Sequence, residues 1–385
     1  MKISLATNYK NDLIDQIKDY HVYEIYGKLK NDFVGGGRPD NSLNDIEKEQ
    51  FEKHVKEVRS AGIRFNYLLN GSCSSNNEQD EEWRNQFIEF LNYLRNIGVN
   101  ALTVTNPHIL KIIKKYFKND FYIRVSTFAG VDSYAKAKFW EEIGADYICA
   151  DFTRINRDFY TLKYIQSHLK HAKLEVLATN SCLKNCPMMF THTSGIAHAS
   201  SKNNNKRDYE DWCLFDCQKK ELFNLDEYIK SPWIRPEDVK YYEEIGIEHI
   251  KLTERNFPTE ELVKRVKAYT IGKYDGNLLD LIQGHGVVKS DNLKLNRKEV
   301  KTSYEIYNEI KRVRGLGVTR ECERHIYIDN NKLDKFIDFF IEGKCNGNCE
   351  SCGYCSRIAK NVIKENKEVS NYLKELYNKY DELKI

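Results

Sequence analysis

One recurring segment constrains the fold of this chain more than any other feature of its sequence. In each copy a small or apolar residue precedes a glycine, a short turn follows, and an apolar, β-rich run comes next. The glycine can adopt the left-handed conformation that ends an amphipathic helix, and the run after it is typical of a buried strand. The sequence therefore predicts a repeated helix-to-strand unit. The copies are AGIRFNYL (61–68), IGVNALTV (97–104), IGADYICA (143–150) and IGIEHIKL (245–252).

Strand patterns occur eight times, and helical patterns separate almost all of them. Eight such units predict a (β/α)8 TIM-like barrel, with a doubly wound parallel sheet as the structural alternative. The expected strands cover residues 2–7, 21–27, 63–69, 101–106, 121–127, 145–152, 174–180 and 248–254.

The same patterns divide the chain into three parts. We expect a barrel over 1–276, a connector with one helix near 303–314 over 277–330, and a helical module with four cysteines over 331–385. A cysteine-rich loop, 181–235, is inserted after the seventh strand. Because the loops after the strands form the reactive face of such a barrel, this loop should lie on that face.

Composition limits the compartment and the partners. The 385 residues include 60 Lys and Arg and 57 Asp and Glu, a net charge of +3 that permits an anionic partner but is less basic than most nucleic-acid-binding domains. The start, MKISLATNYK, is no apolar signal region, and no run has the roughly 18 apolar residues of a membrane helix. We expect a cytoplasmic protein without a membrane partner, whose 11 cysteines serve as metal ligands rather than disulfides.

Four cysteines form two CxxxC pairs in the inserted loop: Cys182 with Cys186, and Cys213 with Cys217. Four thiolates can hold a tetrahedral zinc ion or a 4Fe–4S cluster. Structural zinc sites usually use a two-residue gap, so the three-residue gap favours the larger cluster. Zinc, and cysteines without a metal, remain the alternatives.

A second set, Cys345, Cys349, Cys352 and Cys355, forms a CxxxCxxCxxC run. Its first three members have the spacing of radical S-adenosylmethionine enzymes, in which one iron stays open. Here Cys355 can occupy that iron, and the run follows the barrel instead of its first strand. We expect a closed, ferredoxin-like 4Fe–4S site that transfers electrons or stabilises the module, with zinc as the alternative.

Polar side chains accompany the predicted strands and the loops after them. Such groups are costly in apolar surroundings unless they are paired or used, so we expect a polar pocket with charges of both signs at the barrel mouth. The histidines of the inserted loop could bind metal, move protons or form ordinary hydrogen bonds. Glycines next to an arginine can approach an anion. The candidate catalytic residues are Glu24, Arg124, Asp151, His192 and His198, and the candidate cofactor-binding residues are Gly36, Arg38 and Lys251.

Several motifs together resemble peptidase family U32, also called collagenase-like, from the start of the chain to about residue 285. The second cysteine set resembles a C-terminal extension of some members. The motifs are FNYLLNGSC (65–73), TFAGVDSYAKAKFWEEIGADYI (127–148), NSCLKNCP (180–187), IAHAS (196–200), DYEDWCLFDC (208–217), SPWIRPEDVKYYEEIGIEHIKLTER (231–255) and YDGNLLDLI (274–282).

The resemblance implies an iron–sulfur protein built on a barrel. Its better understood members act in the oxygen-independent hydroxylation of RNA bases and of ubiquinone precursors, and prephenate is the implied oxygen source for several. It also implies that Cys182, Cys186, Cys213 and Cys217 correspond to the family's four-cysteine region. This chain is less basic than the RNA-acting members, so a small molecule or a nucleobase is the expected substrate and nucleic acid stays open.

Three hypotheses follow. The first is an iron–sulfur oxidoreductase that hydroxylates or otherwise modifies its substrate, with a second cluster that relays electrons from a donor protein. The second is a peptidase, which would need a zinc ion with an open position. No HExxH, GxSxG or P-loop motif is present, so the sequence supplies no evident hydrolytic machinery. The third is a non-catalytic electron carrier or scaffold.

Overall fold

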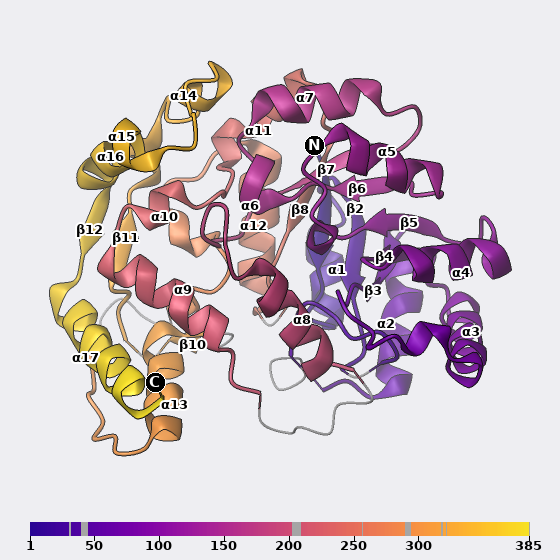
Figure 1. Ribbon diagram of the computed structural model, residues 1–385, viewed down its shortest axis with the longest axis horizontal. Helices are drawn as coiled ribbons and strands as arrows, with labels where there is room; N and C mark the ends of the chain where they lie inside the picture. The colour runs from indigo at the N-terminus through magenta and orange to yellow at the C-terminus, as the bar shows by residue number, and fades with distance from the viewer. Residues whose placement is uncertain are drawn as a thin grey trace.

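The computed structural model describes residues 1–30, 32–39, 45–201, 209–255, 257–288, 294–316, 319–320 and 322–384. Within them, β1 to β8 pair in chain order and close into a parallel barrel, which lies on the right of Figure 1. The strands are β1 Lys2–Ala6, β2 Val22–Gly27, β3 Arg64–Leu69, β4 Ala101–Val104, β5 Tyr122–Val125, β6 Tyr147–Cys149, β7 Lys173–Leu177 and β8 His249–Leu252.

The sheet is closed by the pairing of its first and last strands, with Ile3 opposite Ile250 and Leu5 opposite Leu252. This closure confirms the predicted (β/α)8 barrel, and the doubly wound alternative is wrong. Each predicted strand overlaps an observed one. The predicted strands mostly extend past the observed ends because the residues beyond these ends continue into the loops of the reactive face.

Helices cover the outside of the barrel. Their starts use the expected caps: Asp80 accepts a hydrogen bond from the Trp83 amide, and Asn106 does so from His108 before a helix that begins at Pro107. Their apolar faces, such as Phe51 with Val55, are fully buried. The helices are α1 Asn11–Ile17, α2 Lys48–Ser60, α3 Glu81–Asn96, α4 Pro107–Phe117, α5 Tyr134–Glu142, α6 Phe152–Ile155, α7 Phe159–His168, α11 Val239–Glu244 and α12 Thr259–Ile271.

The glycines of the repeated segment behave as their pattern predicts. Gly62, Gly98, Gly144 and Gly246 have φ angles of 76°, 102°, 104° and 86°. These values lie in the left-handed region that side chains with a Cβ rarely adopt, so each glycine can end its helix and turn the chain into the next strand.

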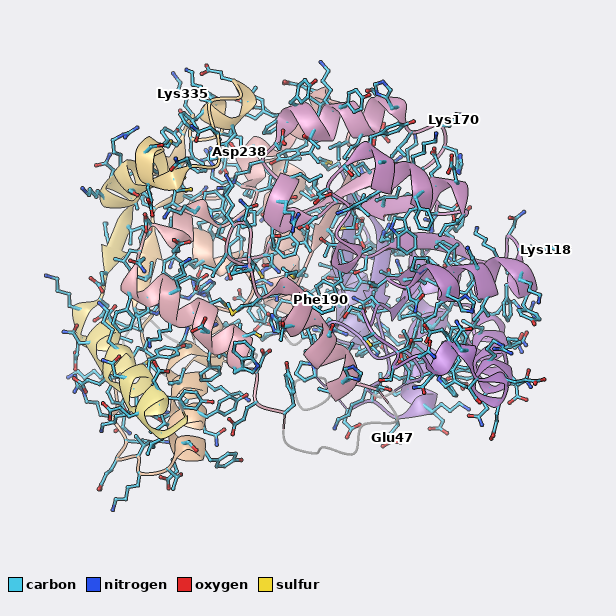
Figure 2. All side chains as sticks on the ribbon, in the orientation of Figure 1. Glu47, Lys118, Lys170, Phe190, Asp238 and Lys335 are labelled. Atoms are coloured by element: carbon cyan, nitrogen blue, oxygen red, sulfur yellow. The ribbon has the colours of Figure 1, made fainter. Side chains whose placement is uncertain are left out.

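The inserted loop after β7 folds into α8 Met189–Ala199, α9 Trp212–Phe223 and α10 Glu227–Lys230, and it ends at the 3-10 turn before α11. Residues 202–208, which join α8 to α9, lie outside the described part. The α8 helix crosses the middle of the face seen in Figure 2, where Phe190 projects with 82% of its surface exposed. The insertion therefore lies between the barrel and the C-terminal part of the chain.

We call the described residues from 294 to 384 the C-terminal unit; it lies on the left of Figure 1. Its β11 pairs antiparallel with β12, which joins the predicted connector to the predicted module. The elements are α13 Ser303–Arg314, β10 Thr319–Arg320 (paired with β9 Val287–Val288), β11 Ile326–Ile328, α14 Asp338–Ile341, α15 Cys349–Cys352, α16 Tyr354–Val362, β12 Ile363–Glu365 and α17 Lys367–Lys384.

Two hydrophobic cores hold this unit. Phe336, before α14, continues the barrel core and packs on Trp233 with ring centres 5.5 Å apart. A separate core joins α13 and α17 to α9, where Phe215 stacks on Tyr307 at 4.5 Å. The helix that carries Cys213 and Cys217 is therefore held in part by the end of the chain.

No helix in the described ranges is both long and apolar enough to cross a membrane.

Candidate functional site

The first cysteine set comes from two segments that the fold brings into one region. Cys182 and Cys186 follow β7, and Cys213 and Cys217 lie in the first two turns of α9. Burial raises the pKa of all four thiols, that of Cys213 to about 12. Cys186 raises the pKa values of the other three further, and Cys182 also acts on Cys217. The four predicted ligands are therefore electrostatic neighbours.

In type and number these side chains fit an iron–sulfur cluster, which takes four cysteine thiolates. Mutual repulsion disfavours four thiolates without a cation, and a positively charged metal core reverses that effect. In the described ranges, no group of three or more His, Cys, Asp or Glu side chains is arranged to hold a metal ion.

The two predicted catalytic histidines both lie on α8 but in different surroundings. His192 is half-buried, with Nε2 2.9 Å from Oδ1 of Asp211, and Asp211 also caps α9 by accepting from the Leu214 amide. His198 is exposed, with Nδ1 3.2 Å from Ser75 Oγ in the loop after β3. His192 thus ties α8 to the start of the helix with Cys213, whereas His198 lies apart from it.

Glu24 and Arg124 form an ion pair inside the barrel, and each side chain is 1% exposed. Glu24 also accepts hydrogen bonds from Ser4 Oγ at 2.8 Å and from Asn66 Nδ2 at 3.0 Å, while Nε of Arg124 lies 3.4 Å from Glu175 of β7. The expectation that these two residues converge over the mouth is wrong, because each stands in mid-strand. They form a buried polar layer below the mouth.

Asp151, the third predicted catalytic residue, follows β6 and caps α6. Its Oδ1 accepts from the Thr153 amide at 3.0 Å and from the Thr153 hydroxyl at 2.8 Å. Its charge also raises the pKa of Cys186, after burial. Asp151 therefore lies beside the first cysteine set, with one oxygen engaged in the helix cap.

The glycine segment after β2 meets the end of β8 and the inserted loop. The Gly36 amide donates to Ser200 Oγ at 2.8 Å, and a Cβ on Gly36 would come within 3.2 Å of Lys28 Nζ. Arg38 Nη2 lies 3.2 Å from Glu254 Oε1. The predicted residues Gly36 and Arg38 thus lie at the barrel mouth, where glycine allows close packing around a buried cation.

The mouth also holds three buried cationic side chains, and they differ in how fully neighbouring carboxylates or hydrogen-bond acceptors balance their charge. Lys28 lies 3.2 Å from Asp32, and Lys251, whose Nζ is 4.1 Å from the centre of the Tyr26 ring, is attracted by Glu175. Arg255 is 6% exposed, and among the described residues its Nη1 has no hydrogen-bond partner. Burial, and then the charge of Arg38, lower the Arg255 pKa to about 10.

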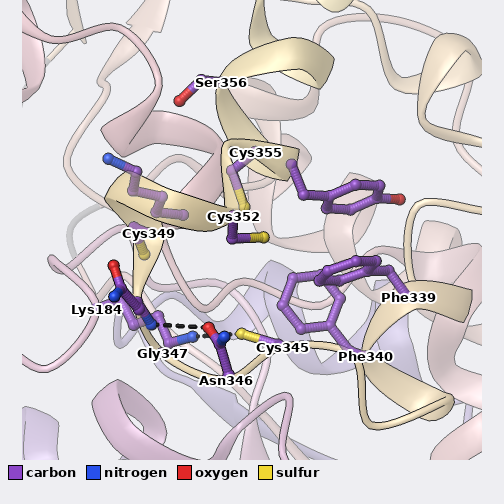
Figure 3. A pocket seen from close by; sticks show the side chains of 13 residues that line it. Lys184, Phe339, Phe340, Cys345, Asn346, Gly347, Cys349, Cys352, Cys355 and Ser356 are labelled. Carbon is purple, nitrogen blue, oxygen red and sulfur yellow. Dashed lines mark hydrogen bonds between the residues drawn. The ribbon is translucent and has the colours of Figure 1, made fainter.

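The second cysteine set lines a pocket with an empty volume of about 400 Å³, including its mouth (Figure 3). Lys184, which lies between Cys182 and Cys186 in the sequence, reaches this pocket and places Nζ 3.0 Å from Cys345 Sγ. Burial raises the pKa of Cys355 to about 11, and Arg157 opposes that rise. The structure thus brings all four members of the second set together.

Sequence reasoning missed several charged residues of these sites. Glu175 carried a usable signal, since it is a charged residue between the apolar residues Leu174 and Val176 of the strand KLEVL. Arg255 follows the end of β8, where polar residues were expected. Lys184 and Arg157 gave no local signal, because their contacts join segments far apart in the chain.

Comparisons with known proteins give a family model, a named relative and a solved structure that are similar to this chain. A family model described as "Peptidase family U32" matches residues 38–272. The protein named uncharacterized protease MJ1657, from Methanocaldococcus jannaschii, is 29% identical over 345 residues, which is 89% of each chain. The solved structure of the U32 peptidase Mk0906 is 17% identical, with a TM-score of 0.49, and the match covers 65% of this chain and 91% of that one.

Proposed function

This chain belongs to peptidase family U32, and we propose that it is an iron–sulfur redox enzyme that modifies a small molecule or a nucleobase at its barrel mouth. The reaction is hydroxylation without dioxygen, or a related change. What supports the proposal is that Cys182 and Cys186, after β7, and Cys213 and Cys217, on α9, come from two segments close enough for Cys186 to raise the pKa values of the other three thiols. When bound by these thiolates, a 4Fe–4S cluster supplies electron transfer or binds an oxygen-bearing donor.

Arg38 supports a connection between the cysteines and the mouth. Its guanidinium forms an ion pair with Glu254 after β8, and its charge lowers the pKa of Cys182 against the larger effect of burial. One side chain therefore contacts the mouth and acts on one predicted cluster ligand, Cys182. In this role Arg38 orients Glu254 and keeps positive charge beside the thiolates.

Arg255 indicates the chemistry of the substrate. Its buried Nη1 is left without a hydrogen bond among the described residues, and Arg38 and Lys251 add positive charge nearby. An unpaired buried donor is costly, and a carboxylate or phosphate of a ligand would satisfy it with a charge-assisted hydrogen bond. We therefore propose that the substrate or co-substrate is an anion bound by Arg255.

Metal content tests the cluster. We expect anaerobically purified protein to contain iron and acid-labile sulfide, and Cys213→Ser to lose the part bound by the first set. Cys73→Ser is the matched control, because Cys73 lies in the loop after β3, is only half-buried and belongs to neither set, so it should leave iron unchanged. Equal iron in the Cys213 variant and the wild type would contradict the proposal.

Measurement of anion binding tests whether Arg255 at the barrel mouth binds the substrate. Prephenate, the oxygen source that the family resemblance implies, is a suitable dicarboxylate probe. Removal of a charge-assisted hydrogen bond costs about 1.5–3 kcal/mol, so Arg255→Gln should weaken prephenate binding roughly 10- to 100-fold in calorimetry. Arg95→Gln, at a side chain that is 45% exposed and pairs with Asp120, is the control and should bind normally.

A peptidase is the second candidate, favoured by the name of the Methanocaldococcus jannaschii relative and of the family. It requires a metal-bound water and hence an open coordination position. Cleavage of gelatin or casein by the purified protein would support it, above all if cleavage persists in Cys213→Ser. Absence of cleavage together with cluster-dependent prephenate turnover would favour the redox enzyme.

A further inference from the structure

We propose that Cys345, Cys349, Cys352 and Cys355 hold a second, closed 4Fe–4S cluster, and that the loop of the first cysteine set couples the two sites through Lys184. The proposed second cluster depends only on the four cysteines of the second set. The coupling rests on the proposed function, because it also requires a cluster at the first set.

The local backbone explains why these four cysteines face one space. Asn348 caps the single turn of α15 by accepting from the Ser351 amide at 3.2 Å, which sets Cys349 and Cys352 one turn apart. Gly353 then adopts a φ of 59°, so the chain turns before Cys355 enters α16. Cys345 approaches from the other side of the pocket (Figure 3).

The ligands and walls of the pocket suit a cluster. Four cysteine thiolates are the usual ligands of a 4Fe–4S cluster. All four cysteines of the second set line one pocket. Phe339 and Phe340 line the same pocket, and Phe339 stacks on Tyr354 at 4.0 Å. An apolar wall of this kind limits solvent at an iron–sulfur centre.

Two cations face the second set, and neither forms an ion pair with a carboxylate in the described ranges. Arg157 is buried, and the hydrogen bonds of its guanidinium go to the carbonyl oxygens of Ile229 and Trp233, at 2.9–3.2 Å. Lys184 donates to Cys345 Sγ at 3.0 Å. Four thiolates on a cluster carry net negative charge, so these cations compensate it, and hydrogen bonds to the sulfurs raise its reduction potential.

The position of Lys184 supplies the coupling. It lies two residues from Cys182 and two from Cys186, so one short loop carries first-set ligands and a hydrogen bond to a second-set ligand. With clusters at both sets, the loop that carries Cys182, Lys184 and Cys186 would link them, and a one-electron reductant would supply the electron. The transfer would oxidise the second cluster by one electron and reduce the first by one, with no bond formed or broken.

Iron content separates the two sites. Anaerobic wild-type protein should contain about eight iron and eight sulfide per chain, that is, two 4Fe–4S clusters. Cys352→Ser and Cys213→Ser should each lose about half. If Cys352→Ser loses iron and Cys213→Ser does not, the second site stands and the proposed function fails. If the iron of Cys352→Ser is unchanged, or if one zinc per chain is lost with Cys352, the second site is overturned.

Paramagnetic resonance of dithionite-reduced protein tests the coupling. We expect a signal split by the interaction of two reduced clusters, which becomes a simple single-cluster signal in either cysteine variant. Two independent signals in the wild type would exclude coupling.

A lysine variant tests the site without removing a ligand. Lys184→Met keeps the aliphatic stem but removes the charge and the hydrogen bond to Cys345, so the second cluster should shift to a more negative reduction potential at unchanged iron content. Lys344→Met is the matched control: Lys344 adjoins Cys345 but is exposed and pairs with Glu342. Equal potentials in the two variants would contradict the role of Lys184.

Discussion

The two cysteine sets reach the same number of thiols by opposite routes. The second set occupies 11 consecutive positions, 345 to 355, and a capped turn with one left-handed glycine gathers it. The first set spans residues 182 to 217, and its two halves meet only because β7 and α9 are packed in place. One arrangement is encoded locally and the other by tertiary structure.

This difference has a physical consequence for stability. A local arrangement fails when its own turn is disturbed, whereas a tertiary arrangement fails when a distant core is loosened. The α9 helix packs against α13 and α17, so the C-terminal unit supports the first set, although it carries the second. Variants in each region can therefore separate the two kinds of encoding.

The largest effect should follow from loosening α9. Phe215 lies between Cys213 and Cys217, is 3% exposed, and stacks on Tyr307. Truncation of a buried phenylalanine costs about 3–5 kcal/mol, so Phe215→Ala should destabilise this core and release first-set iron while second-set iron stays. Denaturant unfolding measures the loss of stability, and iron analysis measures the loss of first-set iron. Phe223→Ala, on the same helix but 45% exposed, should change neither the stability nor the iron content.

Low pH should destabilise the barrel, because a histidine buried there stays neutral in the folded protein. Burial lowers the His54 pKa to about 4, and His54 Nε2 lies 2.8 Å from Thr7 Oγ1. The unfolded chain takes up this proton below about pH 6.5 and the folded chain does not, so stability is constant above that pH and falls between about 6.5 and 4. At about 1.4 kcal/mol per pH unit, the loss reaches roughly 3 kcal/mol.

The variant His54→Gln isolates this effect, because glutamine can keep a hydrogen bond to Thr7 but does not titrate. We expect the variant to be less stable than the wild type at pH 7.5 and to approach it at pH 4.5, as judged by urea unfolding at both values. A constant difference between the two proteins would show that His54 does not contribute to acid sensitivity.

The contrast between local and tertiary encoding also explains which features the sequence predicts. The barrel and its strands follow from a repeated local pattern, and both cysteine sets follow from spacing. The rest required partners that no local pattern records. Glu24 and Arg124 were recognised as unusual charges in strands, but only the closed barrel reveals that they pair with each other below the mouth. Lys184 was not recognised, since its partner lies 161 residues away.

A smaller and purely local effect is expected at Gly353. Its φ of 59° is unfavourable for a residue with a Cβ, and an alanine Cβ would lie 3.3 Å from Nη1 of Arg357, which can move. Gly353→Ala should therefore cost about 1 kcal/mol and reduce iron at the second set only. Glu350→Ala, at an exposed position in α15, is the control. Loss of first-set iron in Gly353→Ala would break the comparison.

The smallest effects should distinguish the two histidines of α8. His192 bonds the aspartate that caps α9, so His192→Ala should cost about 1 kcal/mol and weaken iron retention at the first set. His198 is exposed, and His198→Ala should stay within about 0.5 kcal/mol of the wild type with full iron. Thermal unfolding and iron analysis of the two variants show which histidine supports the first set. Because both side chains leave the same helix, a larger loss at His198 would mean that α8 supports the first set through the loop after β3 and Ser75, not through Asp211.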